Sequence, residues 1–341
     1  MHREPALGMS AHQRRRVADI IKGVYWRLFW SNEKNMKKLL SIVICVMALL
    51  FAGCKTNASV TSSKVETGAA SDITTESVVL HGVVNVDISQ YAFSVSSSKQ
   101  VYFSPGNLQY TQSTNIWSFA ENQYDYIGTD NVTGGSVSSD EYGDYKYGTA
   151  LADKVDLFGW STATTNFGVS TSTASSDYSG SFVDWGTNKI GNDAPNTWRT
   201  LTYDEWDYVV FYRPNASSLK GVAQVNGVNG LILLPDSWSC PADITFKSGF
   251  HSSYGVEYYA AYQTFTADQW SKLASAGAVF LPAASYRYGS SVRYRQYGGG
   301  YWSATEYDGN VASSLYIYSD VAHVDVYNRS LGRSVRLVKD L

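Results

Sequence analysis

The sequence predicts one α+β domain between residues 91 and 341, with two short helices, many short strands and long loops. Three observations lead to this fold class. Short segments rich in Val, Leu, Phe and Tyr alternate with turns of Gly, Ser, Asn and Asp. A helical pattern occurs at two places only. Aromatic residues make up 14% of the chain and charged residues 17%, with 28 glycines, which is the profile of a turn-rich extracytoplasmic protein.

The N-terminal part reads as a targeting segment. Residues 36–54, MKKLLSIVICVMALLFAGC, have two lysines, an apolar run too short to span a bilayer, and small residues before a cysteine. This pattern predicts a lipoprotein signal peptide with lipidation at Cys54; the alternative is a plain secretory signal that happens to contain a cysteine. Because a signal peptide begins near the translation start, we expect Met36 to be the initiator and residues 1–35 to be an upstream over-read.

Residues 55–90 are predicted to be a flexible tether that contains a short strand remnant. The first part, 55–76, is rich in Ser, Thr, Ala and Gly and has no apolar periodicity. The segment 77–88, SVVLHGVVNVDI, has strand composition but is too short to fold alone.

Strands are expected along the rest of the chain. Clear β-type segments are KQVYFSPGNLQY (99–110), GLILLPDSW (230–238) and GAVFLPAASYRYG (277–289). The stretch 314–330, SLYIYSDVAHVDVYNRS, reads as two strands joined by a tight turn. The run Gly298-Gly299-Gly300 is interpreted as a turn.

The two helices are expected at 202–213 and 266–277, and Gly277 marks the end of the second. Each begins with a capping box, in which Thr is followed three residues later by Glu or Gln. The pairs are Thr202 with Glu205 and Thr266 with Gln269. Eight tryptophans that lie within or beside sequence blocks of the predicted domain, two of them on these helices, are expected to be buried: Trp117, Trp160, Trp185, Trp198, Trp206, Trp238, Trp270 and Trp302.

Charge and cysteine content exclude some classes of function. The net charge is −3, and because residues 1–54 contribute +6, the body carries −9. An acidic body argues against nucleic acid as a partner. Of the three cysteines, Cys45 and Cys54 belong to the signal segment and Cys240 stands alone, so we expect no disulfide within the mature body.

Eight sequence blocks follow one another between about residues 92 and 338: AFSVSSSKQVYFSPGNLQY, WSFAENQYDYIG, VDLFGWST, WRTLTYDEW, VNGLILLPDSW, AGAVFLPAASYR, GYWSATEYD and GRSVRLV. They resemble a family of secreted gut-bacterial lipoproteins whose domain has the C-type-lectin-like fold, in the form shared with formylglycine-generating enzymes. The resemblance implies a lipid-anchored protein of the bacterial cell envelope, at the outer membrane. Whether it faces the surface or the periplasm stays open, because no acidic residue follows Cys54.

Some proteins with this fold are variable proteins of diversity-generating retroelements. In these, adenine-directed mutagenesis rewrites codons near the end of the domain, and the rewritten side chains form the ligand-binding face. Asparagine codons rewritten in this way yield Tyr, Ser, Asp, His, Gly, Arg and Asn, which are the types found at outward positions of 286–327. Membership in this hypervariable subgroup stays open.

Enzyme chemistry is not expected. The formylglycine-generating enzymes use a pair of cysteines, whereas Cys240 has no partner in the body. The iron-dependent sulfoxide synthases of this fold use three clustered histidines, whereas His81, His251 and His323 are scattered. We therefore predict no catalytic residue and no cofactor, with an enzyme site near His251 or Cys240 as the alternative.

No metal site is expected either. The calcium motifs of sugar-binding C-type lectins do not occur in the sequence. The acidic loop 138–144, SSDEYGD, offers carboxylates to Ca²⁺, but a solvated polar loop is the favoured interpretation.

A ligand-binding face is predicted near the C-terminus. Nine of the 26 tyrosines fall within residues 286–327. In 314–330 apolar residues alternate with Tyr, His and Asp, which is unusual for a solvated face. Tyr and Arg dominate binding hot spots and Tyr is favoured in antibody paratopes, although Tyr also has a high β-propensity. The predicted ligand-binding residues are Tyr288, Arg293, Arg295, Tyr297, Tyr307, Asp308, Asn310, Tyr316, Tyr318, His323, Asp325 and Tyr327.

In this hypothesis the tyrosines supply stacking area, Arg and Asp orient the ligand, and His323 makes a pH-sensitive contact. The expected partner is a protein or a glycan. The alternative is a structural or adhesin subunit whose face packs against a neighbouring envelope protein.

Overall fold

The computed structural model describes residues 91–127, 153–294 and 296–341, and outside these ranges only four short strands. The chain divides into two units, Met1–Val86 and Asp87–Leu341. In the first unit, β1 (Val65–Thr67) pairs antiparallel with β2 (Gly82–Val84). β2 lies within the segment predicted to be a strand remnant, whereas β1 lies in a segment predicted to be an unstructured tether.

Several predictions fall outside the described residues. They are the over-read 1–35, the signal segment 36–54 with Cys54, the acidic loop 138–144 and Arg295.

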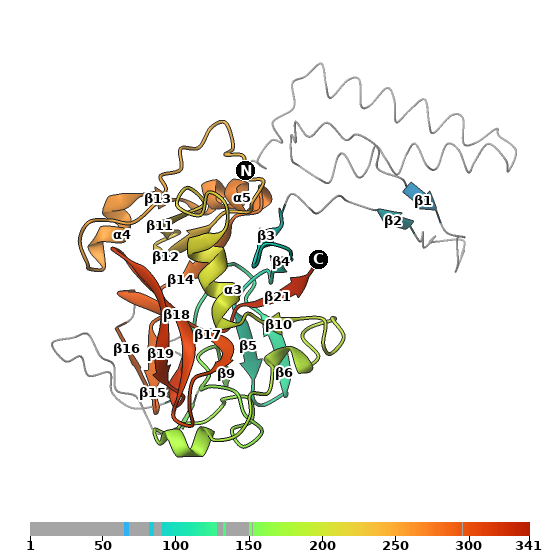
Figure 1. Ribbon diagram of the computed structural model, residues 1–341, viewed down its shortest axis with the longest axis vertical. Helices are drawn as coiled ribbons and strands as arrows, with labels where there is room; N and C mark the ends of the chain where they lie inside the picture. The colour runs from blue at the N-terminus through green and yellow to red at the C-terminus, as the bar shows by residue number, and fades with distance from the viewer. Residues whose placement is uncertain are drawn as a thin grey trace, which may run out of the picture. The chain divides into compact units, whose positions relative to one another are not determined.

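The second unit is α+β, as the sequence predicts, with small sheets and few helices (Figure 1). One four-stranded sheet joins the start and the end of the unit, in the order β10 (Arg199–Thr200), β21 (Leu337–Asp340), β4 (Gln100–Phe103) and β3 (Phe93–Ser94). A second has the order β13 (Thr264–Phe265), β11 (Lys220–Val225), β12 (Val228–Leu233) and β14 (Val279–Pro282).

Three-stranded sheets make up most of the remainder. Their orders are β6 (Ile116–Phe119), β5 (Leu108–Thr111) and β9 (Lys154–Val155); β16 (Ser291–Arg293), β15 (Tyr286–Tyr288) and β20 (Leu331–Gly332); and β17 (Gly298–Glu306), β18 (Val311–Tyr318) and β19 (Ala322–Asn328). A two-stranded pair joins β7 (Val132–Thr133) to β8 (Ala150–Leu151).

The two predicted helices are confirmed, each with its capping box. Helix α3 (Tyr203–Asp207) continues into a π-helical turn, Tyr208–Tyr212. Helix α5 (Ala267–Ser275) ends before Gly277, whose φ of 95° favours glycine. The structure adds a third short helix, α4 (Glu257–Tyr262), and 3₁₀ turns at Ser175–Tyr178 and Trp185–Thr187.

The largest core cluster joins α3 and the β17–β18–β19 sheet to strands of both four-stranded sheets. Trp206 packs there with Tyr301, Leu315 and Ile317, and its indole N–H donates to the carbonyl oxygen of Trp302 at 3.3 Å. The predicted burial of the tryptophans is confirmed at six positions, whereas Trp198 and Trp238 are half-buried. The buried six are Trp117, Trp160, Trp185, Trp206, Trp270 and Trp302.

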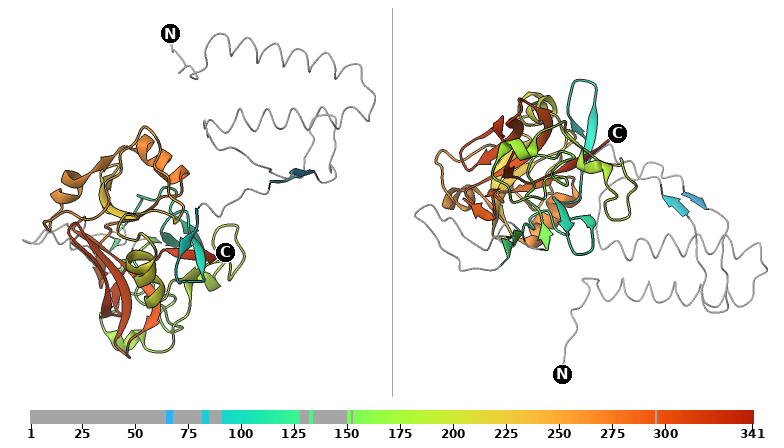
Figure 2. Two further views of the ribbon diagram at one scale, coloured as in Figure 1. Left: turned by 45° about the horizontal axis from the view of Figure 1, so that its top comes forward. Right: turned by 90° about the horizontal axis from the view of Figure 1, so that it is seen from below.

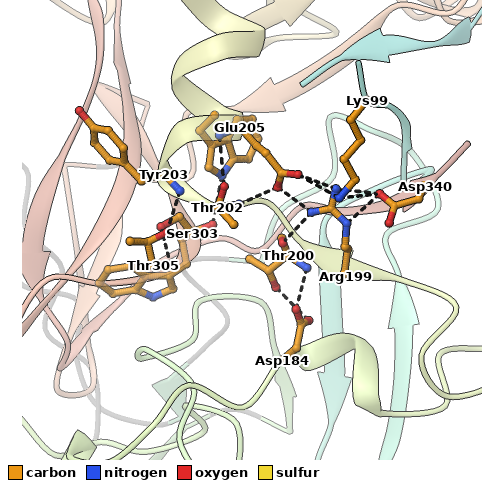
Figure 3. A network of polar contacts seen from close by, with 12 residues as sticks. Lys99, Asp184, Arg199, Thr200, Thr202, Tyr203, Glu205, Ser303, Thr305 and Asp340 are labelled. Carbon is orange, nitrogen blue, oxygen red and sulfur yellow. Dashed lines mark hydrogen bonds and ion pairs between the residues drawn. The ribbon is translucent and has the colours of Figure 1, made fainter. Parts of the chain in front are cut away.

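An ion-pair network lies at the sheet formed by β10, β21, β4 and β3 (Figure 3). It consists of Lys99, Arg199, Glu205 and Asp340, and we call it the terminal ion-pair network. The Arg199 guanidinium donates to both carboxylate oxygens of Glu205, at 2.6 and 2.8 Å, and lies 2.7 Å from the carboxylate of Asp340. Lys99 Nζ lies 3.3 Å from Glu205 and 3.5 Å from Asp340. The network therefore ties helix α3 to strands β10 and β21 and to the residue that precedes β4.

Candidate ligand-binding face

The strands β17, β18 and β19 form one three-stranded sheet (Figure 2), and the antiparallel pairing of β18 with β19 confirms the hairpin predicted at 314–330. One side of this sheet packs against the core, and the other side carries aromatic side chains. Residues paired across antiparallel strands point to the same side. The pairs Leu315 with Val324 and Ile317 with Ala322 lie on the core side. On the opposite side, Tyr316 pairs with His323.

The strand β17 contributes little side-chain bulk to this face at its start. The interpretation of Gly298-Gly299-Gly300 as a turn is wrong, because the three residues begin β17. A Cβ atom on Gly298 would lie 2.9 Å from the Tyr318 ring, and one on Gly300 would lie 2.1 Å from Arg333 Nη1. The glycines are needed for close approach, which lets Tyr318 and Arg333 lie across the strand.

Neighbouring rings form a continuous series on this side. Tyr316 is the centre, with ring centroids 4.5 Å from Tyr318, 5.9 Å from His323 and 5.6 Å from Tyr327. Tyr318 lies 5.1 Å from Tyr254, from which the series continues through further tyrosines at 6.0–6.4 Å. We call this set the aromatic face: Tyr254, Tyr286, Tyr294, Tyr297, Tyr316, Tyr318, His323 and Tyr327.

Exposure differs within the aromatic face. Tyr254 is 49% exposed, whereas Tyr316 is 4% exposed. Burial raises the pKa of the Tyr316 hydroxyl far above its usual value. The expectation that Tyr316 lies outward for a ligand is therefore corrected, because neighbouring rings cover it and it supports them.

Arg333 lies beneath the aromatic face and is fully buried. Its guanidinium carbon lies 3.7 Å from the ring centroid of Tyr327 and 5.0 Å from that of Tyr316. Nη1 donates to the Ser314 hydroxyl at 3.2 Å, and buried Nε has no hydrogen-bond partner. Among the described residues no carboxylate forms an ion pair with Arg333. Cation–π contacts therefore replace a counter-charge, and burial lowers the pKa of Arg333.

His323 is partly exposed and lies on the same side of the sheet as Tyr316. Its Nε2 lies 3.0 Å from the hydroxyl of Tyr327. Burial lowers the pKa of His323, Asp325 opposes the shift, and Arg333 adds to it. The neutral imidazole is therefore favoured in the fold.

Other predicted residues lie outside the series of rings. Arg293 stacks on Tyr288, with 5.3 Å from the guanidinium carbon to the ring centroid. Asp308 accepts from the backbone amides of Asn310 and Val311, at 2.7 and 2.9 Å, so it caps its own turn. The remaining three are exposed: Tyr307, Asn310 and Asp325. Within the described part of the chain, the ring of Tyr307 pairs with no ring of the aromatic face.

Sequence reasoning missed Tyr254 because it lies outside the tyrosine-rich window. The fully buried Ser319 holds the Tyr254 loop beside Tyr318. The Ser319 hydroxyl donates to the carbonyl oxygen of Ser253 and accepts from the amide of Gly255, both at 3.0 Å. The predicted ligand-binding set also lacks Arg333, Tyr286 and Tyr294, although the two tyrosines lie in the tyrosine-rich window.

The described residues contain neither a cluster of metal-ligating side chains nor a long apolar helix. No three His, Cys, Asp or Glu side chains gather there as a metal site. No helix in that part is long and apolar enough to cross a membrane. Cys240 is an exposed free thiol whose sulfur donates to the carbonyl oxygen of Ile244 at 3.3 Å.

Comparison of the chain with protein-family models, with curated proteins and with solved structures finds no match.

Proposed function

We propose that this protein binds a protein or glycan ligand through the aromatic face. The observation that carries the proposal is the contrast between the two sides of one sheet. Leu315 and Ile317 fill the core on one side, whereas Tyr318, His323 and Tyr327 on the other side remain partly exposed. A contiguous group of partly exposed aromatic side chains is a common feature of interaction surfaces.

The chemistry of the aromatic face suits recognition. A tyrosine offers a broad apolar ring and a hydroxyl, and it loses little conformational entropy when it is fixed. Ring-to-ring contacts and the buried guanidinium of Arg333 hold several of these rings in place before a ligand arrives. Pre-organisation of this kind lowers the entropic cost of binding.

The finer fold and the location remain part of the proposal. A C-type-lectin-like fold agrees with the pairing of β4 near the start of the unit with β21 at its end, and with short helices among long loops. Lipid attachment at Cys54, a place in the bacterial cell envelope and diversification by a retroelement rest on the sequence alone.

The test compares variants of the full chain on a glycan array and on a library of displayed random dodecapeptides. We expect saturable binding that Tyr254→Ala with Tyr318→Ala abolishes. Tyr307→Ala is the matched control, because Tyr307 is 69% exposed and lies outside the aromatic face. Binding that survives the double substitution, or a complete lack of saturable binding on both supports, would contradict the proposal.

A further inference from the structure

One corner of the aromatic face combines tyrosine rings with a carboxylate. Tyr254 lies between Tyr318, at a centroid distance of 5.1 Å and an interplanar angle of 73°, and Tyr297, at 6.1 Å. Asp320 follows Tyr318 in the turn between β18 and β19. We call this group, Tyr254, Tyr297, Tyr318 and Asp320, the Tyr254 corner.

The Tyr254 corner is held by buried polar contacts from three segments. The carbonyl oxygen of Ser319 accepts from the amide of His251 at 2.8 Å, in addition to the two hydrogen bonds that the Ser319 hydroxyl makes with the Tyr254 loop. The hydroxyl of Tyr259, which is fully buried, donates to the carbonyl oxygen of Tyr297 at 3.1 Å. The turn, the loop and the Tyr297 segment are thus fixed relative to one another.

The electrostatics of the Tyr254 corner are negative. Ring faces carry negative potential, and Asp320 adds a carboxylate. Burial, the neighbouring tyrosines and Asp320 raise the pKa of Tyr254 to about 12. The buried oxygen Oδ1 of Asp320 has no hydrogen-bond partner. Among the described residues no Lys, Arg or His forms an ion pair with Asp320.

Two cations of the described part of the chain, Lys247 and Arg333, contact rings outside the Tyr254 corner. Lys247 Nζ lies 3.8 Å from the ring centroid of Tyr262. Arg333 is enclosed by Tyr316 and Tyr327. The Tyr254 corner thus has the surroundings that a cation requires without a cation of the described residues in it.

We propose that the Tyr254 corner binds a lysine side chain of a protein partner, which specifies the ligand class of the proposed function. An ammonium group over tyrosine rings gains cation–π energy. A primary ammonium also donates hydrogen bonds, which a quaternary ammonium cannot do, so it can form a charge-assisted hydrogen bond with the Asp320 carboxylate. Val321, which is 42% exposed beside Asp320, offers apolar contact to the methylene stem.

The experiment titrates the full chain with three peptides and follows tyrosine resonances by NMR. The peptides are acetyl-Ala-Lys-Ala-amide, its Nε-acetyl-lysine form and its Nε-trimethyl-lysine form. We expect saturable shifts with the lysine peptide, binding at least about tenfold weaker with the neutral acetyl form, and intermediate binding with the trimethyl form. Equal binding of the lysine and acetyl-lysine peptides would overturn the inference.

Two variants localise the binding. Asp320→Asn keeps the shape of the side chain and removes the charge, and Tyr254→Leu keeps apolar volume and removes the ring. Each should weaken the lysine peptide about tenfold, whereas Tyr307→Leu should leave it unchanged. An Asp320→Asn variant that binds as tightly as the native chain would also overturn the inference.

The experiments distinguish a failure of the lysine assignment from a failure of the proposed binding function. Loss of lysine-peptide binding together with glycan binding that depends on Tyr254 and Tyr318 would overturn the lysine assignment and leave the aromatic face as the binding site. A chain without any tyrosine-dependent binding to arrays or peptides would overturn both.

Discussion

An arginine has different partners in the terminal ion-pair network and beneath the aromatic face. In the network, Arg199 contacts Glu205 and Asp340, so its charge is matched by carboxylates. Beneath the aromatic face, Arg333 is fully buried, and among the described residues it has aromatic rings and one serine hydroxyl as neighbours in place of a carboxylate. In the network, the charged groups pair with one another. In the aromatic face, several tyrosine rings and hydroxyls remain accessible to solvent.

We interpret this difference as one between a structural region and the proposed binding region. Polar groups that have satisfied one another gain little from a ligand, whereas rings held in place without full cover can gain new contacts. The comparison can be tested by substitutions in each region, beginning with the largest expected effect.

Arg333→Ala should lower the free energy of unfolding by about 3 kcal/mol, because it leaves a cavity beneath Tyr316 and Tyr327. Arg333→Met should retain most of the stability, because an apolar side chain of similar length fills the space without a buried unpaired charge. Urea unfolding of both variants measures the difference. Equal losses in the two variants would show that the charge itself, rather than the packing, supports the rings.

Arg199→Met should lower the free energy of unfolding by about 2 kcal/mol, since it leaves Glu205 partly buried without its main partner. Burial alone would raise the pKa of Glu205, but hydrogen bonds from Arg199 and from the Thr202 backbone hold it below the usual 4.5. The stabilisation is therefore present above about pH 4.5 and is lost as the pH falls through the folded-state pKa.

Unfolding curves between pH 7 and pH 3 test this pH dependence. The native chain should lose more stability on acidification than Arg199→Met. Parallel losses would assign the acid sensitivity to other carboxylates.

His323 should titrate with a pKa below 6.5, because it is partly buried near Arg333. Asp325→Asn should lower this pKa further, since Asp325 favours the protonated imidazole, and Arg333→Met should raise it. The imidazole resonances followed by NMR give each value. A pKa that does not respond to either substitution would place His323 outside the electrostatic reach of both groups.

Tyr254→Leu should change the free energy of unfolding by less than about 0.5 kcal/mol, because the side chain is half exposed. This is the smallest expected effect on stability, although the same variant should weaken binding of the lysine peptide about tenfold. Thermal or urea unfolding provides the measurement. A large loss of stability would mean that Tyr254 is a core residue.

Local signals explain most of what the sequence predicted correctly. The capping boxes at Thr202 and Thr266 involve residues three apart, so a short window contains the whole interaction. The alternation in 314–330 likewise assigns Leu315 and Ile317 to one side of a strand without knowledge of the fold.

The errors concern contacts between distant segments. Alternation places Tyr316 on the side opposite the core, but it cannot tell that Tyr318, Tyr327 and Arg333 cover it. A run of glycines indicates a turn locally, whereas the packing of Arg333 across Gly300 is visible only in three dimensions. Tyr254 joins the face through hydrogen bonds to Ser319, 65 positions further along the chain.

The strands β3 and β21, near the start and at the end of the second unit, flank β4 on its two sides. Phe93 in β3 and Asp340 in β21 both pair with Val101 of β4, so their backbones lie about 10 Å apart, which is two strand spacings. A short glycine-rich linker can bridge that gap, and new ends can be opened in a surface loop far from it in sequence. The unit is thus suited to circular permutation and to insertion into a loop of a host protein, with the aromatic face carried along intact.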